Sequence, residues 1–142
     1  MKKKIIAVSG YFNPLHKGHI EMINEAAKLG DVLVIVNNDR QVKLKGSVPF
    51  MDENERRFIV GSLKKVRWTV ISLDDDRSVC RTLAAMNPDI FANGGDVTDK
   101  NIPEKKICKQ LGIKLLFGVG GGKVQSSSQL IGNAIKYDKK KK

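Results

Sequence analysis

Residues 5–19 read IIAVSGYFNPLHKGH and join a short apolar run to a polar loop that contains glycine and proline. The apolar run Ile5 to Val8 has the length and character of a buried strand. Glycine and proline disfavour regular structure in the segment that follows it. From about Gly18 to Leu29, apolar residues return at helical spacing, and Gly30 stands where a helix would end. The stretch therefore predicts a strand, a loop and a helix, in that order.

The rest of the chain repeats this alternation of strands and helices. Further strands are predicted at residues 31–36, 68–73, 89–92 and 113–117, and further helices at 52–64, 77–86, 102–111 and 126–135. The polar segment 37–46 and the glycine-rich segment 119–124 are predicted to be loops. Such alternation is typical of an α/β protein. We therefore expect a Rossmann-like single domain with a five-stranded parallel sheet and helices on both faces.

Size and composition fit one soluble domain, because the chain has 142 residues and 41% of them are hydrophobic. No apolar run approaches the roughly 20 residues that span a membrane, and the run after Lys2 to Lys4 is too short for a signal peptide. We expect a cytoplasmic protein with a folded domain at residues 1–136 and a basic, disordered tail at 137–142. Cys80 and Cys108 form no CxxC pair and are expected to be buried, reduced thiols.

The net charge of the chain is +11, from 26 Lys and Arg residues against 15 Asp and Glu residues. Seven of the positive charges lie in the terminal segments 2–4 and 139–142, where such runs are usually solvated. A positive surface suits anionic ligands such as nucleotides, sugar phosphates or nucleic acid. Aromatic residues make up only 6% of the chain, however, and single-stranded bases need aromatic side chains to stack on. Nucleic acid is therefore the less favoured partner.

Both histidines of the chain, His16 and His19, follow the first predicted strand. Ligands of parallel sheets bind at the carboxyl ends of the strands, which is where this loop begins. A spacing of three residues places both imidazoles on one side of a helix, and Gly18 lets the backbone approach a ligand. The helix N-terminus adds N–H groups and a partial positive charge that favour phosphate. The pair therefore predicts a phosphate site, at which two imidazoles donate to a phosphate that gains charge in the transition state.

Two simpler interpretations of this pair have to be weighed. The histidines could be exposed and without function, or they could bind a metal ion. Their position between a buried strand and a helix argues against the first interpretation. The lack of a third ligand nearby in the sequence argues against the second, so no metal ligand is assigned.

Residues 10–19 resemble a known signature, Gly-x-Phe-Asp-x-x-His-x-Gly-His, of the nucleotidyltransferase superfamily that includes the cytidylyltransferases. One residue departs from it, because Asn13 stands where Asp is usual. An amide donates a hydrogen bond as well as accepting one, so the loop is expected to be held differently. The resemblance covers nearly the whole chain, through Leu29-Gly30-Asp31, Lys45-Gly46, Glu55-Arg56, Gly94-Gly95-Asp96 and Ser126-Ser127-Ser128-Gln129-Leu130.

The resemblance implies one in-line displacement at the α-phosphate of an NTP. Its catalytic residues would be His16, His19 and Lys45, while Arg56 and Lys43 would contact the phosphate of the acceptor. Mg²⁺ would arrive with the NTP. Each role has a structural alternative. Lys43 and Lys45 could be solvated lysines, Arg56 a surface arginine, Asp96 part of a simple turn, and the serines at 126–128 plain N-capping residues. The residues expected to bind the nucleotide are Gly10, Tyr11, Phe12, Asn13, Gly18, Gly95, Asp96, Ser126, Ser127 and Ser128.

The substrates remain open at this point. The resemblance is shared between enzymes that use CTP with glycerol 3-phosphate and enzymes that use ATP with a heptose phosphate. Relatives that use CTP commonly carry an arginine just before the serine motif; here Lys123 stands there and cannot make a bidentate contact. We expect a phosphorylated small molecule as acceptor and, because relatives often pair, a homodimer. The alternative is an inactive module of the same fold that binds nucleotide or RNA, against which the intact histidine pair argues.

Overall fold

The structure, a computed structural model, describes residues 3–94 and 102–120. Within these two segments, no helix is long and apolar enough to cross a membrane. Strands and helices alternate along them, apart from two consecutive helices after the second strand. The elements are β1 (Ile5–Gly10), α1 (Lys17–Ala27), β2 (Asp31–Val36), α2 (Asp39–Leu44), α3 (Glu53–Gly61), β3 (Val66–Ile71), α4 (Cys80–Met86), β4 (Ile90–Gly94), α5 (Lys105–Leu111) and β5 (Lys114–Val119).

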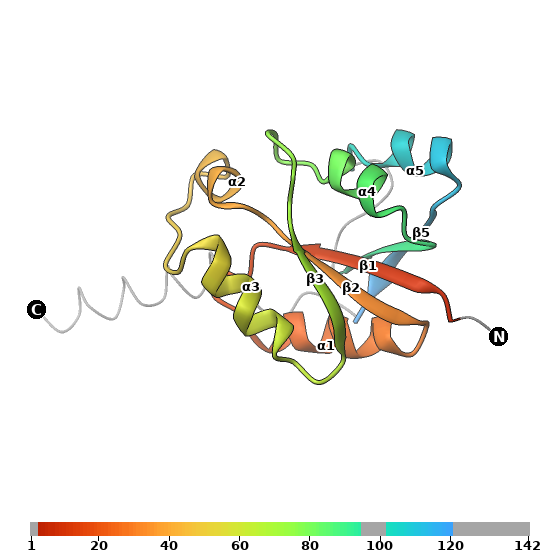
Figure 1. The fold of residues 1–142 in the computed structure, drawn as a ribbon, viewed down its shortest axis with the longest axis horizontal. Coiled ribbons are helices and arrows are strands. Elements are labelled where there is room, and N and C mark those ends of the chain that lie inside the picture. Colours follow the sequence, from red (N-terminus) through yellow and green to blue (C-terminus); the bar gives the residue numbers. More distant parts are fainter. Residues whose placement is uncertain (1–2, 95–101, 121–142) are drawn as a thin grey trace, which may run out of the picture.

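The five strands form one parallel sheet in the order β3-β2-β1-β4-β5, with β1 at its centre (Figure 1). Along its whole length β1 pairs with β2, from Ile5 opposite Asp31 to Gly10 opposite Val36. On its other side β1 pairs with β4. The chain therefore changes direction across the sheet at β1, and the loop after β1 begins at this switch point, where α/β proteins bind their ligands.

Alternating side chains of the strands build a hydrophobic core on each face of the sheet. On one face, Ile6 and Val8 of β1 pack with Ile23 of α1 and Val60 of α3. On the other face, Ala7 packs with Leu83 of α4 and Cys108 of α5. Figure 1 shows α1 and α3 on one side of the sheet and α4 and α5 on the opposite side. Because both faces are covered, the strands of the centre are continuous apolar runs, as in β2, where five of six residues are buried.

The predicted fold class is confirmed, since the sheet is parallel, five-stranded and covered on both faces. The largest difference is α2, because segment 37–46 was expected to be a loop. The strand expected at 68–73 instead spans Val66–Ile71. The helix expected at 126–135 and the tail expected at 137–142 lie outside the described residues.

The two cysteines match their prediction only in part. Both are free thiols, with Cys108 buried and Cys80 partly exposed. Burial raises the pKa of the Cys108 thiol to about 11, and it also raises the pKa of the Cys80 thiol. A raised pKa keeps both thiols protonated near neutral pH, which is typical of structural cysteines.

Candidate functional site

The loop between β1 and α1 starts at the carboxyl end of the central strand and ends at His16, the N-cap of α1. The Nδ1 atom of His16 accepts a hydrogen bond from the backbone N–H of Gly18 at 3.1 Å. In return, the backbone N–H of His16 donates to Nδ1 of His19, also at 3.1 Å. The two histidines thus form a reciprocal capping box, a role usually taken by Ser or Thr with Glu or Gln.

The backbone bonds also select one tautomer for both imidazoles. The rings of His16 and His19 stack, with their centroids 3.8 Å apart and their planes at 26°. Because each Nδ1 accepts an N–H, the proton of each neutral ring belongs on Nε2. Both rings therefore carry their N–H donor on the atom opposite the backbone contact, and both belong to the first turn of a helix.

Phe12 packs against the ring of His19. Its ring is 1% exposed, and it meets the His19 ring edge-on at a centroid distance of 4.7 Å. This placement depends on Gly10, because a Cβ atom there would lie 2.9 Å from the Phe12 ring. The backbone of Phe12 has a φ of 51°, an unusual value for a residue other than glycine. Close packing between Gly10, Phe12 and His19 thus fixes the histidine loop.

Asn13 connects the histidine loop to the segment before α3. Its side chain is 2% exposed, its Nδ2 donates to the carbonyl of Val48 at 2.8 Å, and its Oδ1 accepts from the N–H of Phe50 at 2.9 Å. The aspartate that is usual at this position can accept the second bond but cannot donate the first. The expectation that Asn13 changes how the loop is held is therefore supported by both contacts.

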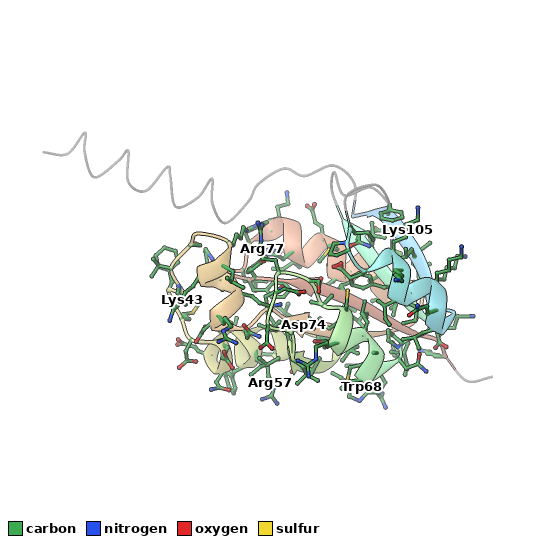
Figure 2. The ribbon with its side chains drawn as sticks, turned by 90° about the horizontal axis from the view of Figure 1, so that it is seen from above. Lys43, Arg57, Trp68, Asp74, Arg77 and Lys105 are labelled. Atoms are coloured by element: carbon green, nitrogen blue, oxygen red, sulfur yellow. The ribbon has the colours of Figure 1, made fainter. Side chains whose placement is uncertain are left out.

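The two lysines expected near the phosphate belong to α2. Lys45 is the C-cap residue of this helix, and its Nζ lies 4.4 Å from the centroid of the Tyr11 ring in the histidine loop. Lys43 is exposed in the last turn of the same helix (Figure 2). The structure therefore brings Lys45 beside the histidine loop and leaves Lys43 on the surface nearby.

The structure places Arg56, which was predicted to bind the acceptor's phosphate, in the interior of the protein. The Arg56 residue is 1% exposed, and its side chain is 0% exposed. All three guanidinium nitrogens donate to the protein: Nε to Met51 O at 3.1 Å, Nη1 to Tyr11 O and Asn37 O at 2.7 Å each, and Nη2 to Asp39 Oδ1 at 2.7 Å. The guanidinium is thus held in the interior, which also excludes the alternative of a surface arginine.

A second polar network, missed by the sequence analysis, holds α2 in place. Asn38 and Gln41 cap α2 reciprocally, and Gln41 is fully buried. The Asn38 amide donates to the carbonyls of Ser72 and Asp74, at 3.0 Å each. The Gln41 amide donates to two further carbonyls of the loop after β3, at 2.7 and 2.8 Å. The capping-box pattern Asn-x-x-Gln was the available sequence signal for this helix.

The loop after β3 is organised around a buried carboxylate, Asp74, which lies in the interior between α2 and α4 (Figure 2). Its oxygens accept from the backbone N–H groups of Arg81 and Thr82 at 2.8 and 3.0 Å, and from the Thr82 hydroxyl at 2.7 Å. Nearby, a hydrogen bond from the Ser78 hydroxyl lowers the pKa of the Asp76 carboxyl below its usual value, and a bond from the Ser78 N–H contributes a smaller part. The loop thus presents a fixed backbone beside α2.

Five of the predicted nucleotide-binding residues cannot be placed. Gly95, Asp96, Ser126, Ser127 and Ser128 lie outside the residues that the structure describes. Within segments 3–94 and 102–120, no group of three or more His, Cys, Asp and Glu side chains is arranged to hold a metal ion.

Fold and site together define an α/β protein with a histidine pair at a helix N-terminus beside the central strand. The family model described as cytidylyltransferase-like matches residues 7–118. The chain therefore belongs to the cytidylyltransferase-like family, a family of nucleotidyltransferases.

Individual relatives agree with this assignment. The chain is 34% identical over 112 residues to the bifunctional protein HldE of Helicobacter pylori strain HPAG1, covering 77% of this chain and 24% of HldE. It thus spans about a quarter of that relative. It is 33% identical over 129 residues to the FAD synthase of Picrophilus torridus, covering 88% of this chain and 91% of the synthase. The crystal structure of the lipopolysaccharide core biosynthesis protein from Thermoplasma volcanium GSS1 is similar, with a TM-score of 0.70 and 32% sequence identity. The match covers 81% of this chain and 95% of that protein.

Proposed function

We propose that this protein transfers a nucleoside monophosphate from an NTP to a phosphorylated small molecule and releases pyrophosphate. The observation that carries the proposal is the stacked pair His16 and His19, with both Nδ1 atoms bound to the backbone in the first turn of α1. This arrangement places two Nε2–H donors close to each other and to the helix N-terminus. Such fixed donors are what a phosphate needs as it gains charge in a transition state.

In the proposed reaction, a phosphate oxygen of the acceptor attacks the α-phosphorus of the NTP. The bond from that phosphorus to the bridging oxygen of the β-phosphate breaks, and pyrophosphate leaves in line with the attack. The Nε2–H groups of His16 and His19 would stabilise the charge on the α-phosphate and the leaving group. Lys45, with Lys43 as the alternative, would neutralise phosphate charge from α2. No covalent bond to the protein forms.

Mg²⁺ and the remaining contacts belong to the proposal. Mg²⁺ usually stays largely hydrated and binds through the phosphates of the nucleotide, so it would enter with the NTP. Gly95 and Asp96 would line the pocket of the base or ribose, and Ser126, Ser127 and Ser128 would bind the β- and γ-phosphates. We also propose that the protein acts in the cytoplasm and as a homodimer.

The relatives favour ATP as the donor over CTP. FAD consists of FMN joined to AMP, and the FAD synthase relative matches almost from end to end. We therefore add FMN to glycerol 3-phosphate and a heptose phosphate as candidate acceptors. All three present a phosphate monoester, which is the nucleophile that the proposed reaction requires.

The test is an assay of pyrophosphate release with Mg²⁺, each of the four NTPs and each of the three acceptors. We expect turnover with one pair and a rate that falls by about 10²- to 10³-fold in His16→Ala or His19→Ala. The matched control is Lys28→Ala at the exposed end of α1, which should keep the wild-type rate. The far-ultraviolet circular dichroism spectrum of each variant would show that the fold survives.

Two outcomes would contradict the proposal. One is nucleotide binding by calorimetry without pyrophosphate release for any pair, which would instead support the inactive binding module. The other is near-normal turnover in both histidine variants.

A further inference from the structure

We propose that Arg56 is a positioning residue, which sets the histidine loop at a fixed place relative to the lysine-bearing helix α2. This inference rests on the proposed function for its catalytic consequence, but its structural content can be tested without turnover. The residue lies in α3, has no exposed surface on its side chain, and reaches three separate parts of the site.

The contacts of Arg56 join segments that are distant in sequence. Nη1 donates at 2.7 Å to Tyr11 O, inside the histidine loop, and at 2.7 Å to Asn37 O, between β2 and α2. Nη2 donates at 2.7 Å to Oδ1 of Asp39, the first residue of α2. One planar group therefore fixes the loop that holds the imidazoles and the start of the helix that ends at Lys45.

Only a guanidinium can make this set of bonds. An ammonium carries three donors on one atom and has no planar fork, so Lys in place of Arg56 cannot reach all four acceptors. The lost bonds would leave buried carbonyls without a donor, and such groups favour a rearranged backbone. Asp39 is 30% exposed and supplies the only countercharge among the four acceptors.

A second contact joins the histidine loop to α2. Lys45 Nζ lies over the ring of Tyr11, the same residue whose carbonyl accepts from Arg56. Asp39 itself is tied to α3, because its N–H donates to Oε1 of Glu53 at 3.0 Å. A shift of the Arg56 guanidinium would therefore change the distance between the imidazoles and the lysine.

The first test reads the imidazoles directly. The chain has only two histidines, so long-range ¹H–¹⁵N spectra show His16 and His19 alone. At about pH 8, above the ordinary imidazole pKa, the wild type should show both rings protonated on Nε2. In Arg56→Lys the Tyr11 carbonyl loses its anchor, and we expect at least one ring to show a mixture of tautomers.

The matched control is Arg57→Lys. Arg57 is the next residue of the same helix, is exposed, and makes one bond of 3.3 Å to Thr69 Oγ1, while Figure 2 shows its side chain on the outside of the molecule. This variant should keep the wild-type tautomers. If Arg56→Lys also keeps them while the protein is folded, the positioning role is overturned, even if its melting temperature falls.

The second test uses Asp39→Asn, which removes the countercharge and keeps the three backbone acceptors of Arg56. We expect both rings to stay protonated on Nε2, because the bond from Arg56 to Tyr11 O remains. With the NTP and acceptor found above, Arg56→Lys should lower kcat by roughly 10²-fold, as expected for a misplaced catalytic group. Asp39→Asn should mainly raise KM for the NTP, because it removes the charge from the contact between Arg56 and α2 and leaves the histidine loop in place.

The two proposals can fail separately. No turnover in the wild type with any substrate pair would overturn the proposed function, and the spectra would still decide the role of Arg56. Turnover that is normal in Arg56→Lys but lost in the histidine variants would overturn the positioning role alone.

Discussion

Gly18 lies at the second position of α1, where a Cβ atom would come 3.0 Å from Cε1 and 3.1 Å from Nδ1 of the His16 ring. Alanine at this position favours the helix by up to about 1 kcal/mol, but its methyl group has to displace the ring. We expect Gly18→Ala to keep or raise the melting temperature and to lower kcat at least tenfold.

Gly61→Ala is the control for this experiment. Its added Cβ would lie 3.4 Å from Thr69 Cγ2, an ordinary contact at the end of α3, so both stability and turnover should stay close to wild type. Wild-type turnover in Gly18→Ala would show that the position of the His16 ring does not limit the reaction.

Single residues differ in how far their role could be predicted from the sequence. The histidine pair was predictable because three residues along a helix start always bring two side chains to one side. The role of Arg56 was not, because its acceptors come from residues 11, 37, 39 and 51 and meet only in the folded chain. A charged residue in a helix is usually exposed, so the sequence analysis expected Arg56 to contact the acceptor's phosphate, with a surface position as the alternative.

Among the elements, the start of α4 is capped mainly by the side chain of Asp74, with a longer bond of 3.4 Å from the Cys80 N–H to Ser78 Oγ. Its N-cap residue, Val79, has no side-chain bond, and Asp74 accepts from the first-turn N–H groups of Arg81 and Thr82 instead. We expect Asp74→Ala to lower the free energy of unfolding by about 1–3 kcal/mol, because buried donors lose their acceptor. Urea denaturation measures this difference.

The neighbouring Asp75 provides the matched control. Its ion pairs with Arg40 and Arg81 are about 70% exposed on both sides, and such pairs contribute little. Asp75→Ala should change the free energy of unfolding by less than about 0.5 kcal/mol. Equal effects of the two substitutions would contradict the assigned role of Asp74.

Elements were predictable where burial is strong and less so at the sheet edge. The bounds of β2 were predicted correctly, because this inner strand is one buried apolar run. β3 is an edge strand that ends at Ile71. Leu73, two residues beyond this end, is 52% exposed, so the apolar run 68–73 did not mark the end of the strand. α2 is short and polar, and it is held by Asn38 and Gln41 rather than by an apolar face.

The stability of the whole molecule should depend on pH through Glu104. This residue is 8% exposed, and its Oε2 has no hydrogen-bond partner among residues 3–94 and 102–120. Burial raises the pKa of its carboxyl above the usual 4.5, so folding favours the protonated form. The associated stability is present below about pH 4.5 and is lost as pH rises through the raised pKa.

We therefore expect Glu104→Gln, which cannot ionise, to lose less stability than the wild type as the pH rises above about 4.5. Urea denaturation at several pH values gives the difference in free energy of unfolding between the two proteins. That difference should shift in favour of the variant as pH rises. The exposed Glu25→Gln serves as the control, and a difference independent of pH would refute the role of Glu104.

Whole-molecule architecture was predicted well, because the alternation of elements fixes a parallel sheet covered on both faces. The order of the strands was not predicted, since it depends on which strand each crossover reaches.

The central place of β1 has a consequence for amide hydrogen exchange. Strands bonded on both sides and covered on both faces open only with the whole domain, so their amides exchange slowest. Through Gly10, the histidine loop continues directly from such a strand. Partial openings that fray β3 or β5 at the sheet edges would leave the base of this loop closed, and the imidazoles would keep their geometry until the domain unfolds globally.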